Sequence, residues 1–206
     1  MRIIIVRHGE TVYNLEKRYQ GHTDVELTDL GREQAVRTAE RLSHEPVAAV
    51  YSSDLIRASE TARIIARPHH LRVQTDVRLR ECAFGDWEGL NVDEIRERYP
   101  EEWGDYRQDS VRHRAPRGER LESVLDRVRC AAEHIEERHP HDTVVLVGHG
   151  GALTAFCCYA LGASLYTFRK LRLENCGITI FSRDPSRPWF LEVLNDTCHL
   201  DGMANG

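Results

Sequence analysis

Two strand-like segments of the sequence end in the same way, with a histidine followed by a glycine. The first is IIIVRHG at residues 3–9, and the second is VVLVGHG at residues 144–150. Runs of branched aliphatic residues are typical of strands in a parallel sheet that is covered on both faces. Ligands of open α/β sheets bind at the carboxyl ends of the strands, and a glycine there lets the backbone approach a ligand closely. The pattern predicts that His8 and His149 meet at one binding edge.

Arg7 directly precedes His8, and this pair indicates phosphoryl chemistry. A neutral imidazole is a nucleophile, and an adjacent cation lowers the imidazole pKa, which keeps the ring unprotonated at neutral pH. The planar guanidinium group of arginine holds phosphoryl oxygens by paired hydrogen bonds. We therefore expect His8 to attack phosphorus while Arg7 holds the phosphoryl group.

The segments that must position these residues alternate between strand and helix. Thr28 is the expected N-cap of the helix that follows the first strand, and VAAVYSS at residues 47–53 predicts the next strand. Ser53 is the expected cap of a second helix. The apolar stripe of residues 118–139 predicts another helix, and GITIFSR and WFLEVLN predict two closing strands. The alternation indicates an α/β protein with a parallel sheet.

Residues 78–118 interrupt this alternation. They contain RLRECAFGDWEGL, a short polar helix from about residue 91 to residue 99, and the start of a basic segment at residues 107–120. We expect an insertion over the sheet edge that is part loop and part lid. The basic segment is either a solvated loop or a rim that attracts phosphate.

Composition excludes several classes of protein. The chain has 206 residues, 41% of them hydrophobic and 30% charged, with a net charge of −5. These values describe an ordinary soluble domain without the basic footprint of a nucleic-acid partner. The longest apolar run is too short for a bilayer, and the N-terminus opens into a strand rather than a signal peptide, so we expect a cytoplasmic protein with no membrane contact. Six cysteines without a C-x-x-C pair argue against a zinc site and a disulfide framework.

Six ordered blocks of the sequence resemble the histidine phosphatase superfamily, the phosphoglycerate-mutase-like group named for its Arg-His-Gly motif. The blocks are RHGET at 7–11, Asn14, QGHTDVELTDLG at 20–31, YSSDLIRASETA at 51–62, LRECAFGDWEGL at 79–90 and GHGG at 148–151. The resemblance covers nearly the whole chain. It implies a single domain over residues 1–206, folded as a three-layer sandwich with a mostly parallel central sheet and helices on both faces.

The resemblance also implies the roles of the site residues. His8 is the nucleophile that becomes phosphohistidine, and Arg7, Arg57 and His149 complete the pocket around the phosphoryl oxygens. Glu81 matches the acid of the family, which protonates the leaving alkoxide and then deprotonates the water that hydrolyses phosphohistidine. Such roles agree with the physical needs of phosphoryl transfer, in which charge spread over three oxygens requires fixed donors and an alcohol requires a proton. The residues expected to bind substrate are Asn14, Gln20, Gly21, Thr23 and Gly150.

Several of these residues have structural alternatives. Arg57 could be an exposed residue of a helix, although a place in the first helical turn favours anions. Glu81 could pair with Arg78 or Arg80. Glu10 could contact substrate or form an ion pair with a neighbour. Five other histidines have no support from the resemblance and are expected to be surface or structural residues: His22, His69, His70, His113 and His199.

The activity is expected to be hydrolysis of a small phosphomonoester. The mutases of the family hold phosphoglycerate with an arginine, a tyrosine and a lysine, at places where this chain has Cys82, Phe84 and Val92. Loss of such contacts weakens binding of a small anion. A mutase, or a non-catalytic phosphate-binding protein, is the alternative. We expect no metal and no other cofactor, because the sequence has no cluster of metal ligands. A homodimer is left open.

The cues to the substrate conflict. DWEGL and GERLESVLDRV resemble the α-ribazole phosphatase and broad-specificity phosphatase branch, whereas LNDTCHL at residues 194–200 resembles the tail of metal-independent phosphoserine phosphatases. We also expect Phe84, Trp87 and Trp103 to give the pocket an apolar wall that accepts several phosphomonoesters.

Overall fold

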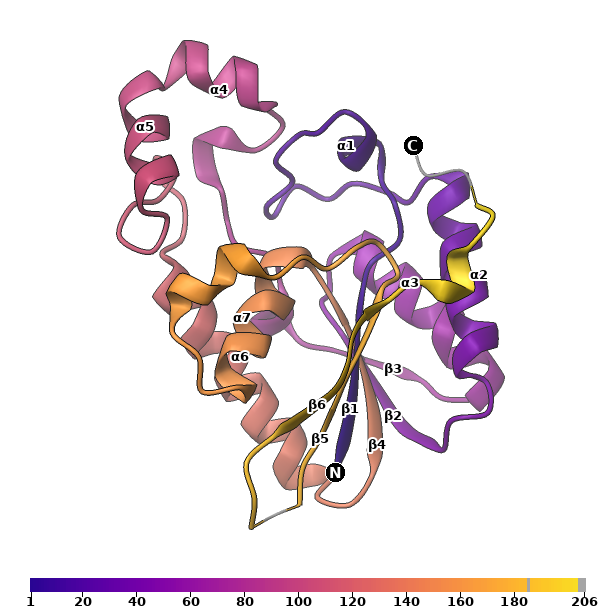
Figure 1. Cartoon of the computed structure of the whole chain (residues 1–206). Coiled ribbons are helices and arrows are strands. Elements are labelled where there is room, and N and C mark those ends of the chain that lie inside the picture. The colour runs from indigo at the N-terminus through magenta and orange to yellow at the C-terminus, as the bar shows by residue number, and fades with distance from the viewer. Residues whose placement is uncertain (185, 204–206) are drawn as a thin grey trace.

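A six-stranded sheet with helices on both faces forms the centre of the molecule (Figure 1). The computed structural model describes residues 1–184 and 186–203. The strands are β1 (Arg2–Arg7), β2 (Val47–Ser52), β3 (Val73–Thr75), β4 (Thr143–Gly148), β5 (Ile178–Ser182) and β6 (Phe190–Asp196). Their spatial order is β3-β2-β4-β1-β5-β6. The first four in this order are parallel, and β5 pairs antiparallel with both β1 and β6. This topology confirms the predicted mostly parallel sheet.

The helices form the two outer layers. The α-helices are α1 (Val12–Leu15), α2 (Asp29–Leu42), α3 (Ile56–Ala66), α4 (Val92–Arg98), α5 (Pro100–Gln108), α6 (Leu121–Arg138) and α7 (Gly150–Ala160). Short 3₁₀ helices are η1 (Arg67–His69), η2 (Val77–Leu79), η3 (Gly85–Trp87), η4 (Leu165–Lys170) and η5 (Cys198–Leu200). Figure 1 shows α2 and α3 on one face of the sheet and α6 and α7 on the other, which confirms the three-layer arrangement.

The four central residues of β1, from Ile3 to Val6, are apolar, because the strand is covered on both sides. Ile3 and Ile5 pack into the core beneath α6 and α7, whereas Ile4 and Val6 pack into the core beneath α2 and α3. All four are at most 1% exposed. Complete burial of a side chain of this size stabilises the fold by roughly 1.5–3 kcal/mol relative to exposure. The strand that delivers Arg7 and His8 is therefore anchored in both layers of the core.

The parallel pairing of β1 with β4 brings the two histidines together. Arg7 lies opposite Gly148 in the ladder, and the His8 N–H donates to the Gly148 carbonyl at 2.9 Å. Both strands end at this point, so His8 and His149 both follow the carboxyl edge of the sheet.

The segment at residues 78–118 is more ordered than a loop. Helices α4 and α5 project beyond the α6 and α7 layer, beside the loop that carries α1 (Figure 1). They enclose a small core of their own, formed by Trp87, Ile95, Trp103 and Ala115. Phe84 packs against both this core and the main one. The expectation that Trp87 and Trp103 line the pocket is therefore wrong, because their indole rings are buried inside the segment of residues 78–118, which we name the lid segment.

Two local predictions also differ from the structure. Helix α3 begins at Ile56 rather than directly after Ser53. The Ile56 N–H donates to the Asp24 carboxylate, so the helix is capped from a distant loop. Helix α5 was not expected, although Pro100 at its first position is a known start signal. Within the described residues, no helix is both long and apolar enough to cross a membrane.

Candidate active site

The imidazole of His8 is held in one tautomer by its own backbone neighbour. Its Nδ1 lies 2.7 Å from the Gly9 carbonyl oxygen, which can only accept, so Nδ1 carries the proton. The lone pair of Nε2 is then free, and no described residue donates to it. Burial lowers the pKa of His8 well below its usual value, and the charges of Arg57 and Arg7 lower it further. The ring is neutral at physiological pH and is equipped to act as a nucleophile.

His149 has the opposite tautomer. Arg57 Nε donates to its Nδ1 at 3.2 Å, so the proton of a neutral ring lies on Nε2. Burial and the charge of Arg57 lower the pKa of His149 well below its usual value. The rings of His8 and His149 have centroids 5.2 Å apart. An N–H donor and a nucleophilic nitrogen therefore lie side by side.

Two buried donors at this site find no acceptor among the described residues. They are Arg7 Nε and His149 Nε2. The other end of the Arg7 guanidinium is anchored, because Nη1 donates to the Leu173 carbonyl at 2.7 Å. A buried donor without a partner is costly unless a ligand satisfies it. The two groups are thus suited to bind an anionic oxygen.

Arg57 is completely buried in the first turn of α3, which excludes the exposed alternative. Besides His149, it donates to the Thr23 carbonyl at 2.8 Å and to the Gly21 carbonyl at 2.7 Å. Burial lowers its pKa to about 10, so the group stays charged at physiological pH. It supplies positive charge beside both histidines.

Glu81 approaches the site from the chain segment after η2. Its carboxylate accepts from the N–H groups of Gly151 and Ala152, at 3.0 and 3.1 Å, and from the Cys82 N–H at 2.8 Å. The N-cap residue of α7, His149, offers no side-chain cap, so Glu81 caps this helix from outside. The arrangement fixes the carboxylate next to the carboxyl edge of the sheet and gives it the favourable field of a helix N-terminus.

The structural alternatives for Glu81 and Glu10 are also resolved. Arg78 pairs with Asp76 and Arg80 pairs with Asp54, so neither pairs with Glu81. Glu10 is buried, accepts a hydrogen bond from the Thr28 hydroxyl at 2.8 Å, and does not line the cavity that holds His8.

Of the residues predicted to bind the phosphoryl group, Arg7 and Arg57 line a cavity of about 210 Å³, and His149 does not. Its lining residues are Arg7, His8, Asn14, Lys17, Arg18, Tyr19, Gln20, Gly21, Arg57, Glu81 and Phe84. His149 lies against this group through Arg57 and His8. The Asn14 oxygen accepts from Thr11, which leaves the amide nitrogen as the donor available to a ligand.

Thr23 and Gly150 lie beside this cavity rather than in its wall. Thr23 donates through its hydroxyl and its N–H to the carboxylate of Glu88, which also accepts from the N–H of Phe84. Through its carbonyl, Thr23 holds Arg57. Gly150 lines a neighbouring groove instead.

That groove is apolar and begins next to Glu81. It has a volume of about 260 Å³ and is lined by Phe84, Gly150, Gly151, Thr154, Phe168, Arg169, Leu171 and Leu173. Phe84 belongs to both hollows, and a Cβ added to Gly151 would collide with Oε1 of Glu81. The absence of a side chain at Gly151 lets the carboxylate lie against the N-terminus of α7.

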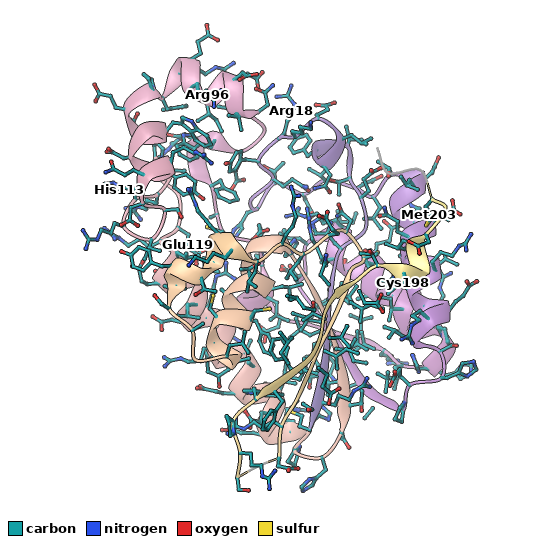
Figure 2. The ribbon with its side chains drawn as sticks, in the orientation of Figure 1. Arg18, Arg96, His113, Glu119, Cys198 and Met203 are labelled. Atoms are coloured by element: carbon teal, nitrogen blue, oxygen red, sulfur yellow. The ribbon has the colours of Figure 1, made fainter. Side chains whose placement is uncertain are left out.

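Several lining residues were not found by sequence reasoning. Lys17, Arg18 and Tyr19 fill the gap between two expected residues, so their position in the chain was the available signal. Arg18 donates to the Glu94 carboxylate on α4, and it is labelled beside the lid segment in Figure 2. Asn175 donates to the His8 carbonyl at 2.8 Å, and nothing in its local sequence pointed to this contact.

Two other expectations concern residues outside the cavity. None of the arginines of residues 107–120 lines it, so this basic segment does not form its rim. Within residues 1–184 and 186–203, no three His, Cys, Asp or Glu side chains are grouped so that they could hold a metal ion.

Comparison with known proteins identifies the family. A family model described as "Histidine phosphatase superfamily (branch 1)" matches residues 3–197. Phosphoglycerate mutase-like protein 4 of Arabidopsis thaliana is 39% identical over 203 residues, which cover 97% of this chain and 86% of that protein. Phosphoserine phosphatase 1 of Hydrogenobacter thermophilus is 36% identical, with 97% and 94% covered.

A solved structure agrees with these matches. Bacillus stearothermophilus YhfR superposes with a TM-score of 0.91 at 34% identity, covering 97% of this chain and 99% of that one. The family model spans nearly the full chain, and the site carries the Arg-His-Gly motif at its centre. The chain therefore belongs to branch 1 of the histidine phosphatase superfamily, and it is a phosphoric monoester hydrolase.

Proposed function

We propose that this protein hydrolyses small phosphomonoesters through a phosphohistidine on His8, with Glu81 as general acid and base. One observation carries the proposal. The unprotonated Nε2 of His8 lies among buried N–H donors, Arg7 Nε and His149 Nε2, that have no acceptor among the described residues. The phosphorus atom of a phosphoryl group is an electrophile for His8 Nε2, and the phosphoryl oxygens accept hydrogen bonds from the other two groups.

In the first half of the reaction, the His8 Nε2 lone pair forms a bond to phosphorus while the bond from phosphorus to the ester oxygen breaks. Arg7, Arg57 and His149 stabilise the charge on the phosphoryl oxygens. Protonated Glu81 gives its proton to the leaving alkoxide, which departs as an alcohol. The His8 Nδ1 proton stays hydrogen-bonded to the Gly9 carbonyl, which stabilises the charge that the ring acquires.

In the second half, the Glu81 carboxylate removes a proton from water as the water oxygen attacks phosphorus. The bond from phosphorus to His8 Nε2 breaks, and inorganic phosphate leaves. The N–H groups of Gly151 and Ala152 hold the carboxylate in place for both proton transfers. The cycle returns the enzyme to its starting protonation state.

Hydrolysis is favoured over mutase activity by the side chains at three positions. Cys82 is a buried thiol whose pKa is raised by burial, Phe84 is an apolar wall of the cavity, and Val92 packs against the lid core. None of the three offers a cation or a strong donor to a second anionic group. Lys17 and Arg18 in the cavity wall are the observation that keeps the mutase as a second candidate.

The apolar groove supports a leaving group with an apolar part. A substrate whose phosphoryl group lies at His8 must place its ester oxygen near Glu81, and the groove is lined by Gly151, whose N–H donates to this carboxylate. Phe168, Leu171 and Leu173 then offer an apolar surface to the alcohol part. We propose that aryl and other bulky apolar phosphomonoesters are better substrates than glycerol phosphates.

Rapid quenching with phosphorus-labelled substrate tests the covalent step. Phosphohistidine is acid-labile, so the quench is kept alkaline. Label should be trapped on the wild-type protein and absent from His8→Ala, whose rate should fall by several orders of magnitude because no neighbouring side chain replaces the nucleophile. Label on a serine, aspartate or cysteine would overturn the proposed mechanism.

The same preparation separates hydrolysis from mutase activity. A coupled assay measures interconversion of 2- and 3-phosphoglycerate beside phosphate release. Phosphate release should exceed mutase flux by a wide margin, and the reverse result would replace the phosphatase with the mutase.

A further inference from the structure

Arg127 on α6 directs its guanidinium at the backbone that carries Glu81. Its Nη1 donates to the carbonyls of Arg78 and Arg80, at 2.7 and 2.5 Å, and its Nη2 donates to the carbonyl of Glu81 at 2.8 Å. The side chain is only 19% exposed. Three carbonyl oxygens at or just before Glu81 are thus held by one planar cation, whose fork fixes their relative positions.

Glu119 completes the arrangement on the other side of Glu81. Its carboxylate accepts from Arg127 Nε and Nη2, at 2.8 and 2.9 Å, and it also accepts from the Ala83 N–H at 3.3 Å. The Glu119 N–H donates in turn to the Ala83 carbonyl at 2.8 Å. Figure 2 shows Glu119 where the lid segment returns toward α6. The chain is therefore held both before and after Glu81.

A third contact comes from the loop after α1. The Nε2 of His22 lies 2.8 Å from the Glu81 carbonyl, which already accepts from Arg127. Because a carbonyl only accepts, His22 Nε2 is the protonated nitrogen. Among the described residues, neither Arg127, Glu119 nor His22 lines the cavity that holds His8.

We propose that the Arg127–Glu119 pair is a positioning device for the proton donor of this enzyme. It fixes the backbone of Glu81 against the N-terminus of α7, so that the carboxylate meets the N–H groups of Gly151 and Ala152 and remains beside the ester oxygen. Arg127 contacts neither substrate nor reacting atoms and acts through Glu81. The proposal rests on the role proposed above for Glu81.

The pair acts on proton transfer and not on nucleophilic attack, because its contacts end at the Glu81 segment. His8 is held by β1, Gly9 and Asn175, which are independent of Arg127. A displacement of about 1 Å at a catalytic group can cost about 10²-fold in rate. Loosening the pair should therefore impair substrates that need a proton and spare those that do not.

Arg127→Lys tests this, because it keeps the charge and loses the planar fork. The measured quantity is kcat for an alkyl phosphate against kcat for p-nitrophenyl phosphate, whose leaving group departs without a proton. The alkyl rate should fall about 10²-fold, and the p-nitrophenyl rate should fall much less. Arg129→Lys, on an exposed residue of the same helix, is the matched control and should leave both rates unchanged. Equal losses for the two substrates would overturn the proposal.

A double-mutant cycle adds a readout that a structural role would not move. In a Glu81→Gln background there is no proton transfer left to position, so Arg127→Lys should not reduce the alkyl rate further. A multiplicative further loss would overturn the proposal. Glu119→Gln keeps the shape and an acceptor for Ala83, so it is a milder variant that should show the same substrate-dependent loss to a smaller extent. If Glu119→Gln lowered the alkyl and p-nitrophenyl rates equally, the positioning role of the pair would be overturned, even if Arg127→Lys did not fold.

The failure of this proposal is distinguishable from the failure of the proposed function. Glu81→Gln alone is measured first on both substrates. If its losses were equal for alkyl and p-nitrophenyl esters, Glu81 would not be the proton donor and the proposed function would fall. If Glu81→Gln depended on the leaving group while Arg127→Lys did not, only the positioning role would fall.

Discussion

At the scale of single residues, the chemistry of this site depends on which nitrogen of each histidine carries a proton. His8 and His149 are both buried and neutral, yet the Gly9 carbonyl assigns one tautomer and the Arg57 donor assigns the other. The residue types and their order were predictable, because each histidine ends an aliphatic strand before a glycine. The tautomers were not, because they depend on the local backbone conformation that turns the Gly9 carbonyl toward His8 and on Arg57, which only the folded chain brings to His149.

Gly151 is a residue whose missing side chain the mechanism requires. A Cβ in Gly151→Ala would collide with Oε1 of Glu81 and displace the carboxylate from the α7 N-terminus. Loss of general-acid catalysis is worth about 10²- to 10⁴-fold, so kcat for an alkyl phosphate should fall within that range. Hydrolysis of p-nitrophenyl phosphate should fall less.

Gly104→Ala is the matched control, because a Cβ at that helical glycine meets nothing within 4 Å. It should leave both rates unchanged and raise the free energy of unfolding by about 1 kcal/mol, the usual gain for this exchange in a helix. If Gly151→Ala hydrolysed alkyl phosphates at the wild-type rate, the position assigned to Glu81 would be wrong.

At the scale of elements, the parallel pairing of β1 and β4 determines the site, and this was readable from hydrophobic runs. The lid segment was less predictable. Helix α5 is polar on most of its surface, and the rings of Trp87 and Trp103 were assigned to the pocket although they form a separate core. An aromatic residue in a sequence shows that apolar contact is needed, but it does not show which of two neighbouring cores supplies it.

Helix η4 carries Phe168 into the groove proposed for the leaving group. Phe168→Ala should therefore raise KM for an aryl phosphate by about 10- to 200-fold, as expected for the loss of an apolar contact worth about 1–3 kcal/mol. KM for glycerol phosphate should change little. Tyr166→Ala, an exposed position of the same helix, should change neither value. A uniform change for both substrates would place the alcohol elsewhere.

At the scale of the whole molecule, the site makes stability depend on pH. The pKa values of His8 and His149 lie well below the unfolded value of 6.5, mainly because both rings are buried. Above that value the two histidines are neutral in both states and cost nothing. Below it the unfolded chain binds protons that the folded chain does not, so the free energy of unfolding falls as pH falls.

Urea unfolding between pH 7.5 and 5.0 measures this dependence. Each buried histidine should contribute a slope of up to about 1.4 kcal/mol per pH unit below pH 6.5. His8→Ala should therefore reduce the total slope by the contribution of one histidine. An unchanged slope in His8→Ala would mean that this ring is not held neutral by the fold.

Metal removal is the second test at this scale. Activity should survive excess EDTA, because the proposed steps use only side chains and backbone donors of this chain. Vanadate should inhibit, since it mimics five-coordinate phosphorus among Arg7, Arg57 and His149. Complete loss on chelation, restored by Mg²⁺ or Zn²⁺, would contradict the proposed mechanism.

The Arg127–Glu119 pair holds the segment of Glu81 by its backbone, and every residue except proline offers the same backbone N–H and carbonyl groups. The carbonyls of Arg78, Arg80 and Glu81 and the N–H of Ala83 make their contacts whatever side chains these positions carry. Substitution of the neighbouring side chains, Cys82 and Phe84, therefore leaves these backbone contacts of the proton donor in place. In a library randomised at these two positions, variants should retain the alkyl to p-nitrophenyl rate ratio while their substrate ranges diverge, so the segment is a site at which new specificities can evolve.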